Sequence, residues 1–299
     1  MRDASLRTPL YQASEDTYFK CEFLHPGRSH KARVAKALVD DAERRGEISP
    51  GGPRVLLERT GGNLGISLAM EARNRGYRLT LVTDPHYSSI KREMAARFGA
   101  QVVNRGISFP ECANNQDVID ILLKERDSPY FYLDQFGNPA NPRAHELGTG
   151  AEILAQLRDE GHGSGTTVVL VGGLGTGASM RGVSTALGHW FERVVTIGVQ
   201  PENCDLRRGV YGDHPIQGIA VGQPPPFFPP RELDDVVTVS GTRATEARHR
   251  LAREHGFFTG PSSGANVAAL EAARALPVDR PDLPRIFVTL LYDRGEDYE

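Results

Sequence analysis

Lysine is scarce in this sequence of 299 residues. Of the 35 lysine and arginine residues only five are lysines, namely Lys20, Lys31, Lys36, Lys91 and Lys124. An arginine side chain keeps its proton at any usable pH, whereas a lysine amine can lose its proton and act as a nucleophile. Any amine chemistry in this protein is therefore restricted to five side chains.

The sequence also lacks metal-site cysteines, long apolar runs and a large net charge, and each absence excludes a class of protein. Cys21, Cys112 and Cys204 show neither metal-site nor disulfide spacing, so we expect no metal and a reduced, cytoplasmic setting. No apolar run reaches 18 residues and residues 1–5 begin no apolar segment, so we expect neither a membrane span nor a signal peptide. A net charge of −3 argues against a nucleic-acid partner.

Short apolar strands alternate with helical segments along most of the sequence. Strands are predicted at residues 17–24, 55–58, 78–82, 101–103, 166–171, 194–199 and 286–291. Helices are predicted at residues 31–45, 66–75, 88–98, 118–126, 144–157, 180–191, 242–255 and 265–275, and a loop at 137–142. This alternation is typical of parallel sheets covered by helices on both faces. We predict an α/β protein of two doubly wound, three-layer domains, residues 1–137 and 138–299. Roughly the first 30 residues can pack on the second domain instead of the first.

A glycine-rich turn follows the predicted strand 166–171 and begins the next helix. Its sequence is GGLGTGAS at residues 172–179. The glycines let the main chain approach an anion closely, and the positive end of the helix dipole at the helix start favours a negative charge. The turn lacks the G-K-[ST] of a Walker A motif and the last glycine of a dinucleotide fingerprint. It therefore predicts a phosphate site, with a close-packed turn between strand and helix as the alternative.

Two further turns of small residues lie at 60–65 and 260–264. Parallel sheets bind ligands at the carboxyl ends of their strands, which is where such turns lie. The N–H groups of the first turn can bind a carboxylate, and Asn63 can donate or accept a hydrogen bond. Asn63, Ser262 and Ser263 can equally be plain helix caps, and the residues alone leave both interpretations open.

Among the lysines, Lys31 is the best placed for a cleft because it lies where a turn meets a helix. Lys36 follows five residues later, on a different face of that helix. Lys91 and Lys124 lie in amphipathic helices, where we expect solvated side chains, and Lys20 lies in a strand that could be an edge strand.

Taken together, five segments resemble the cysteine synthase and cystathionine β-synthase branch of the fold type II (tryptophan synthase β-like) pyridoxal-phosphate enzymes. HPGRSHKAR at residues 25–33 is similar to N-P-G-x-S-x-K-D-R, and TGGNLG at 60–65 to T-S-G-N-T-G. QFGNPANP at 135–142, GLGTGAS at 173–179 and GPSSG at 260–264 are similar to Q-F-x-N-P-A-N-P, G-x-G-T-G-G-T and G-x-S-S-G. Each motif is weak alone, but five in family order are specific.

The resemblance implies a site for pyridoxal 5′-phosphate. Lys31 would hold the cofactor as an internal aldimine and act as the catalytic base, Asn63 would bind the ring hydroxyl, and Ser262 would face the pyridine nitrogen. The phosphate would be held by Gly175, Thr176, Gly177, Ala178 and Ser179. The substrate carboxylate would be bound by Gln135 and by Thr60, Gly61, Gly62, Asn63 and Leu64.

The resemblance also implies ping-pong β-replacement in amino-acid biosynthesis by a cytoplasmic homodimer. An activated L-serine, O-acetyl- or O-phospho-L-serine, would lose its β-substituent to give an α-aminoacrylate, to which a small nucleophile would add. A hydroxyl such as that of Ser262 does not favour a protonated ring nitrogen as a carboxylate would, and this suits β-elimination.

Four departures from the family pattern cluster at the expected substrate site. Gly61 replaces a serine, Leu64 a threonine and Ala32 an aspartate, and His30 is unusual beside Lys31. We therefore expect a donor or a nucleophile different from that of a housekeeping cysteine synthase. The product could then be a non-proteinogenic amino acid such as 2,3-diaminopropionate.

Two other functions stay open at this point. The first is a pyridoxal-phosphate-dependent β-eliminase or serine/threonine dehydratase, which would share the cofactor motifs. The second is a non-catalytic binding module that keeps the fold. The intact set of Lys31, Asn63 and Ser262 argues against a module, because a pure scaffold does not need a lysine that reacts with aldehydes.

Overall fold

The computed structural model describes residues 7–84, 88–277 and 283–298. Residues 1–5, on which the expectation of no signal peptide depends, lie outside these ranges. No helix within the described ranges is both long and apolar enough to cross a membrane. The chain forms two compact units, called here the four-stranded unit (residues 26–141 with 297–299) and the six-stranded unit (residues 1–25 with 142–296).

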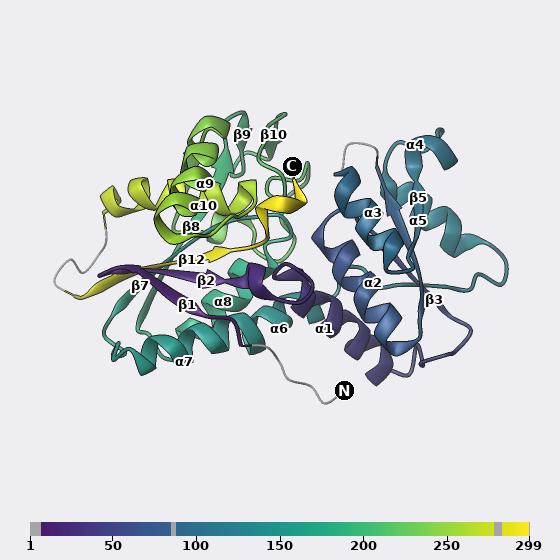
Figure 1. The fold of residues 1–299 in the computed structure, drawn as a ribbon, viewed down its shortest axis with the longest axis horizontal. Coiled ribbons are helices and arrows are strands. Elements are labelled where there is room, and N and C mark those ends of the chain that lie inside the picture. Colours follow the sequence, from purple (N-terminus) through teal and green to yellow (C-terminus); the bar gives the residue numbers. More distant parts are fainter. Residues whose placement is uncertain (1–6, 85–87, 278–282, 299) are drawn as a thin grey trace. The chain divides into compact units, whose positions relative to one another are not determined.

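The four-stranded unit is built on a parallel sheet with the strand order β5-β4-β3-β6. Of this sheet, β3 and β5 are labelled in Figure 1. Leu56 and Leu57 are neighbours on one strand, and they face opposite sides of this sheet. Leu56 packs in a cluster with α1 and α2, and Leu57 in a cluster with α5, so the unit has three layers. Its strands are β3 (Val55–Arg59), β4 (Arg78–Thr83), β5 (Gln101–Asn104) and β6 (Tyr130–Tyr132). Its helices are α1 (Lys31–Arg44), α2 (Asn63–Arg75), α3 (Ser89–Arg97), α4 (Arg105–Ser108) and α5 (Asn115–Lys124).

The six-stranded unit has a mostly parallel sheet with the order β1-β2-β12-β7-β8-β11, in which only the β1–β2 pair is antiparallel (Figure 1). Leu170 packs in a cluster with α7 and α8, and Val171 in one with α9 and α10, so helices again cover both faces. The strands of this sheet are β1 (Leu10–Ser14), β2 (Thr17–Cys21), β7 (Thr167–Gly173), β8 (Arg193–Pro201), β11 (Asp235–Val239) and β12 (Arg285–Leu291). The helices are α7 (Ala151–Asp159), α8 (Ala178–Gly188), α9 (Gly241–His255) and α10 (Pro261–Ala275).

Several short elements complete the chain. A two-stranded ribbon pairs β9 (Cys204–Asp205) with β10 (Val210–Tyr211). A short helix, α6 (Ala140–Ala144), runs into one π-helical turn (His145–Gly150) that continues as α7. Single 3₁₀ turns lie at Glu22–Leu24, Pro230–Glu232 and Gly295–Asp297.

The prediction of an α/β fold with parallel-rich sheets is confirmed, and some local predictions are wrong. The loop predicted at 137–142 becomes helical from Ala140, because the Asn138 side chain accepts a hydrogen bond from the Ala140 N–H at 2.9 Å and Pro139 suits a first helical turn. The strand predicted at 17–24 ends at Cys21 and continues as a 3₁₀ turn. The segment predicted as a helix at 144–157 is helical throughout, with residues 145–150 in the π-helical turn. The two units divide after residue 141, where we expected a boundary at 137, and β1 and β2 lie in the six-stranded unit.

Candidate cofactor and substrate site

The loop between β3 and α2 carries most of the predicted substrate residues. The hydroxyl of Thr60 accepts a hydrogen bond from the Gly62 N–H at 3.3 Å, and this closes the turn. Gly62 is the N-cap of α2, and Asn63 is the first helical residue. The interpretation of Asn63 as a helix cap is therefore wrong.

Leu64, which replaces a threonine of the family pattern, has its side chain in the core. That side chain is 2% exposed and packs with Leu68 in the core cluster of the four-stranded unit. Any contact of Leu64 with a substrate would come from its main chain.

Gln135 is attached to the end of β3 by two hydrogen bonds. Its side-chain amide donates to the Arg59 carbonyl at 3.2 Å, and its main-chain N–H donates to a carboxylate oxygen of Glu58 at 3.1 Å. Glu58 is fully buried and also accepts from the Arg59 N–H at 3.0 Å. The structure thus brings Gln135 and the 60–63 loop together at the carboxyl edge of one sheet.

Glu58 is a site residue that the sequence reasoning missed. Burial raises the pKa of its carboxyl to about 8, and the nearby Asp134 charge acts in the same direction, while the two N–H groups that it accepts act in the opposite one. The available signal was an acidic residue at the end of an otherwise apolar strand, directly before the 60–65 turn.

Lys31 begins α1, where its main-chain N–H donates to the Ser29 hydroxyl at 3.2 Å. Burial lowers the pKa of its amine to about 8, and the charge of Glu58 opposes that shift. The amine can therefore lose its proton near neutral pH, as a nucleophile or a base requires.

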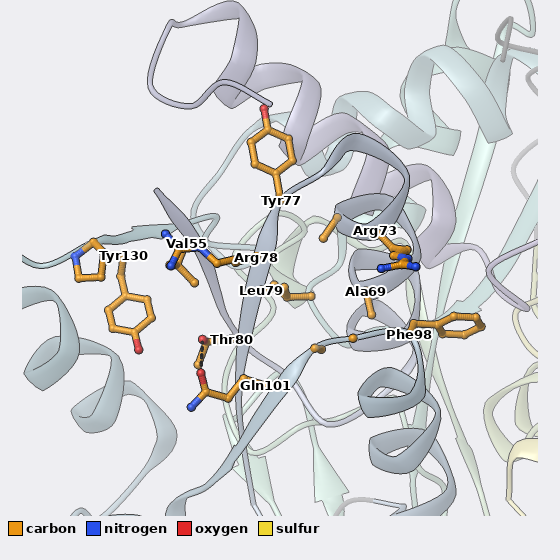
Figure 2. A pocket seen from close by; sticks show the side chains of 14 residues that line it. Val55, Ala69, Arg73, Tyr77, Arg78, Leu79, Thr80, Phe98, Gln101 and Tyr130 are labelled. Carbon is orange, nitrogen blue, oxygen red and sulfur yellow. Dashed lines mark hydrogen bonds between the residues drawn. The ribbon is translucent and has the colours of Figure 1, made fainter. Parts of the chain in front are cut away.

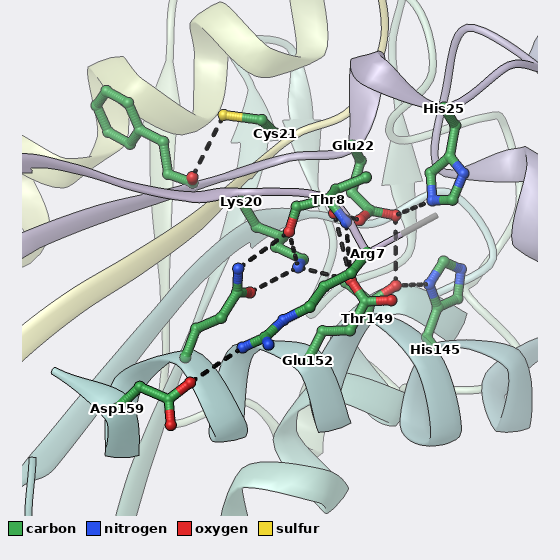
Figure 3. A network of polar contacts seen from close by, with 12 residues as sticks. Arg7, Thr8, Lys20, Cys21, Glu22, His25, His145, Thr149, Glu152 and Asp159 are labelled. Atoms are coloured by element: carbon green, nitrogen blue, oxygen red, sulfur yellow. Dashed lines mark hydrogen bonds and ion pairs between the residues drawn. The ribbon is translucent and has the colours of Figure 1, made fainter. Parts of the chain in front are cut away.

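The other lysines hold structural or solvent-facing positions. Lys20 is fully buried on β2, an internal strand, where it donates to Glu152 at 2.7 Å (Figure 3), so the suggestion of an edge position is wrong. Lys91 is 4% exposed and lies over the Tyr298 ring at 3.6 Å, so its predicted solvation is also wrong. Lys36 pairs with Asp40 on the surface, and Lys124 is exposed as predicted.

The predicted phosphate loop lies in the six-stranded unit, between β7 and α8. Helix α8 begins at Ala178, two residues earlier than predicted, and the Ala178 N–H donates to the Thr176 hydroxyl at 3.3 Å. Gly177, the N-cap, has a φ of +79°, and a Cβ built on it would lie 2.8 Å from the Phe228 nitrogen. The loop therefore has the glycine-dependent geometry and the helix N-terminus that suit a phosphate group.

Replacing Gly177 by alanine should lower the thermal stability of the protein and its affinity for pyridoxal phosphate. A left-handed non-glycine residue costs about 1–2 kcal/mol, and the contact with Phe228 adds to that cost. Gly188→Ala, in the same helix with open space around it, is the matched control and should keep both properties. Thermal unfolding with and without the cofactor measures both; equal behaviour of the two variants would contradict the expectation.

Ser262 lies in the same unit as the phosphate loop and close to it. It is 4% exposed, and a Cβ built on Gly218 would lie 3.7 Å from its hydroxyl oxygen. The Gly218 carbonyl in turn would be 2.9 Å from a Cβ on Gly175, so Gly218 lies between the loop and Ser262. Helix α10 has Gly260 as its N-cap, which makes the interpretation of Ser262 or Ser263 as a cap wrong.

A buried tyrosine supports the loop, and the sequence reasoning missed it. The Tyr292 hydroxyl donates to the Gly173 carbonyl at 3.2 Å, and the Asn266 side chain accepts from the Gly173 N–H at 2.9 Å. Burial raises the pKa of the Tyr292 phenol, which hydrogen bonds to Asn266 and Ser179 partly offset. A polar residue directly after the apolar strand 286–291 was the available signal.

A cavity of about 420 Å³ in the four-stranded unit lies away from these residues (Figure 2). The first residue of each of its four strands, Val55, Arg78, Gln101 and Tyr130, lines the cavity, which places it at the amino edge of the sheet. Ligands of parallel sheets bind at the carboxyl edge, where the 60–63 loop and Gln135 lie.

The groups that each unit carries are of the kinds that pyridoxal phosphate requires. The four-stranded unit has an amine that can be uncharged. The six-stranded unit, taken by itself, has a glycine-dependent loop at a helix N-terminus and a buried serine hydroxyl. Among residues 7–84, 88–277 and 283–298, no group of three or more histidine, cysteine or acidic side chains could hold a metal ion.

Comparison with known proteins gives matches over nearly the whole chain. A family model described as pyridoxal-phosphate dependent enzyme matches residues 1–283. The cysteine synthase of Staphylococcus aureus (strain Mu50 / ATCC 700699) is 33% identical over 295 residues, which cover 98% of this chain and 90% of the relative. The O-ureido-L-serine synthase of Streptomyces lavendulae is 35% identical over 302 residues, covering 98% and 88%.

The fold is similar as well. A crystal structure of O-ureido-L-serine synthase has a TM-score of 0.83 to this chain at 33% identity, and the match covers 98% of this chain and 90% of that one. The fold is therefore that of the fold type II enzymes, and the cofactor is pyridoxal 5′-phosphate. The chain belongs to the pyridoxal-phosphate dependent enzyme family, as a transferase of the cysteine synthase type.

Proposed function

We propose that this enzyme replaces the β-substituent of an activated L-serine by a small nucleophile. The observation that carries the proposal is Lys31 at the start of α1, where burial lowers the pKa of its amine to about 8 although the charge of Glu58 opposes that shift. Two relatives support it: they are named cysteine synthase and O-ureido-L-serine synthase, and each named product carries a heteroatom substituent on the β-carbon.

The residues act as follows in the proposed reaction. Pyridoxal phosphate, when bound, supplies an electron sink that makes the α-proton of an amino acid acidic. The Lys31 amine would hold the cofactor through its aldehyde and, once the substrate amine has displaced it, would be free to accept the α-proton at Nζ. Asn63 donates to the ring hydroxyl oxygen, and Ser262 hydrogen bonds to the ring nitrogen. Gly175, Thr176, Gly177, Ala178 and Ser179 hold the phosphate.

The substrate carboxylate is bound by the turn at the end of β3. We assign this role to Thr60, Gly61, Gly62, Asn63 and Leu64, with Gln135 adding a side-chain amide. Within the turn the Thr60 N–H donates to the Val82 carbonyl and the Gly62 N–H to the Thr60 hydroxyl, so the donors for the carboxylate are the other main-chain N–H groups, the Thr60 hydroxyl and the Asn63 amide. The fixed position of Gln135 against Arg59 and Glu58 supports this role. Because Gly61 lacks the usual hydroxyl, the carboxylate here is held by fewer side-chain donors.

The donor is O-acetyl- or O-phospho-L-serine, and the product is a specialised amino acid such as 2,3-diaminopropionate. Departures from the family pattern at Gly61, Ala32 and His30 support specialisation. So does the similarity to a relative named O-ureido-L-serine synthase, which is as high as the similarity to cysteine synthase.

Mixing the holoenzyme with each donor tests the proposal. We expect O-acetyl- or O-phospho-L-serine to change the visible absorbance of the enzyme, and a β-substituted alanine to form when sulfide or ammonia is added. L-Serine, whose hydroxyl is a poor leaving group, should be nearly inert and is the control. Mass spectrometry identifies the products. Pyruvate and ammonia without any β-substituted alanine would instead establish a lyase, and inertness toward both donors would refute β-replacement.

The enzyme is further proposed to act as a cytoplasmic homodimer. All three cysteines, Cys21, Cys112 and Cys204, are buried and free, which suits a reducing compartment. The family resemblance supports the dimer. Sedimentation of the purified holoenzyme tests the dimer, because a monomer would sediment with half the expected mass.

A further inference from the structure

Arg59 is the last residue of β3 and directly precedes the proposed carboxylate-binding turn. Its main-chain carbonyl accepts the Gln135 side-chain amide at 3.2 Å. Its side chain is half-buried, and the Nε–H donates to the Tyr132 hydroxyl at 3.1 Å. The guanidinium carbon lies 4.5 Å from the centre of the Phe136 ring, and Phe136 is the residue after Gln135. This arginine is therefore part of the same edge of the sheet as the proposed substrate turn.

Two contacts restrict the position of the Arg59 guanidinium group. Its carbon lies over the Phe136 ring, and its Nε–H donates to the Tyr132 hydroxyl. The Tyr132 hydroxyl can accept this bond and still donate to Gln116, whose oxygen lies 3.5 Å away. Burial raises the pKa of the Tyr132 phenol, so it stays neutral and does not neutralise Arg59. The two terminal amino groups are left to bind a planar or tetrahedral anion, the recognition for which arginine is suited.

Arg59 forms no ion pair in the part of the chain that the structure describes. No carboxylate there lies within 4.0 Å of its nitrogens, whereas Arg105 pairs with Asp84 and Arg28 with Asp297 in the same unit. The buried Glu58 carboxyl is close enough for its pKa to be lowered by the Arg59 charge, but burial raises that pKa to about 8, so Glu58 is mostly protonated at neutral pH and compensates the half-buried guanidinium only weakly. An anionic ligand would supply the missing charge.

We propose that Arg59 selects a substrate that carries a second anionic group, a carboxylate or phosphate in addition to the α-carboxylate. The inference rests on the proposed function and names the substrate class of that same site. Two sources of the anion share this chemistry: the leaving group of the donor, as in O-phospho-L-serine, or a carboxylate on the nucleophile. Both are tested with the same variant.

The test measures KM and kcat for Arg59→Gln with matched charged and neutral reactants. O-Phospho-L-serine is compared with O-acetyl-L-serine as donor, and thioglycolate with 2-mercaptoethanol as nucleophile. Loss of a charge-assisted pair with Arg59 should raise KM about 10- to 100-fold for one of the two charged reactants, either O-phospho-L-serine or thioglycolate. The kcat value and the KM for the neutral member should change little, and Arg59→Lys should recover part of the loss.

Arg54→Gln is the control, since Arg54 is an exposed arginine just before the same strand, bonded to the Ser128 carbonyl at 3.3 Å. It should leave all four KM values unchanged. Equal losses with charged and neutral reactants in Arg59→Gln would show a merely structural role, and no loss would remove Arg59 from recognition; either result overturns the inference while leaving the proposed function intact. A wild-type enzyme inert toward every donor would overturn both.

Discussion

Replacing Lys31 by alanine is expected to abolish the visible absorbance of the cofactor-loaded protein and to reduce turnover by at least about 10³-fold. The variant loses the only group proposed to bind the aldehyde of the cofactor and, with it, the base that accepts the α-proton. A positioned general base alone contributes about 10²- to 10⁴-fold to a rate. The lowered pKa of about 8 gives this amine a fraction of the uncharged form near neutral pH that a solvated lysine lacks.

Absorbance spectra of the purified variants, taken before and after addition of pyridoxal phosphate, measure the first effect. Lys36→Ala is the matched control, because Lys36 lies on the same helix α1 and pairs with Asp40 at the surface. It should keep the absorbance band and the activity of the parent protein. A band that persists unchanged in Lys31→Ala would assign the cofactor to another lysine.

Local sequence patterns predicted the architecture well because strands and helices here are apolar on the faces that they bury. The strand 166–171 reads as a continuous apolar run since β7 is covered on both faces. Missed strands are short or lie at a sheet edge: β6 has three residues, and β1 is an edge strand with mostly exposed side chains. Their pairing is decided by the neighbouring strand, which no local window contains.

Local conformation at the proposed site could be predicted where the main chain determines it. The glycines at 175 and 177 and the start of α8 could be read from local sequence, because a turn after a strand dictates them. The environment of a charged side chain could not be read in that way. Arg59 meets Tyr132 and Phe136 from distant parts of the sequence, and the burial of Lys91 depends on Tyr298. Thirty arginines gave no reason to single out one of them before the fold was known.

Lys20→Met is expected to destabilise the protein by about 3–5 kcal/mol, the largest stability effect of any single change considered. The ammonium group of Lys20 has three donors and three acceptors: the Thr8 carbonyl at 2.7 Å, Glu152 at 2.7 Å and the Gln156 side chain at 2.8 Å (Figure 3). Methionine fills a similar volume but leaves all three acceptors without this donor.

The cost is high because a second carboxylate lies in the same network. The Thr8 hydroxyl donates to Glu22 at 2.6 Å and lies 3.5 Å from Glu152, so removal of Lys20 takes away the ammonium that pairs with Glu152 in a network that also contains the fully buried Glu22. The midpoint of urea unfolding measures the loss. Lys36→Met removes a lysine–carboxylate pair whose side chains are 42% and 44% exposed, and it should cost no more than about 0.5 kcal/mol. Equal midpoints for the two variants would mean that solvent or rearranged side chains replace the Lys20 ammonium, and that the buried network contributes little to the stability of the six-stranded unit.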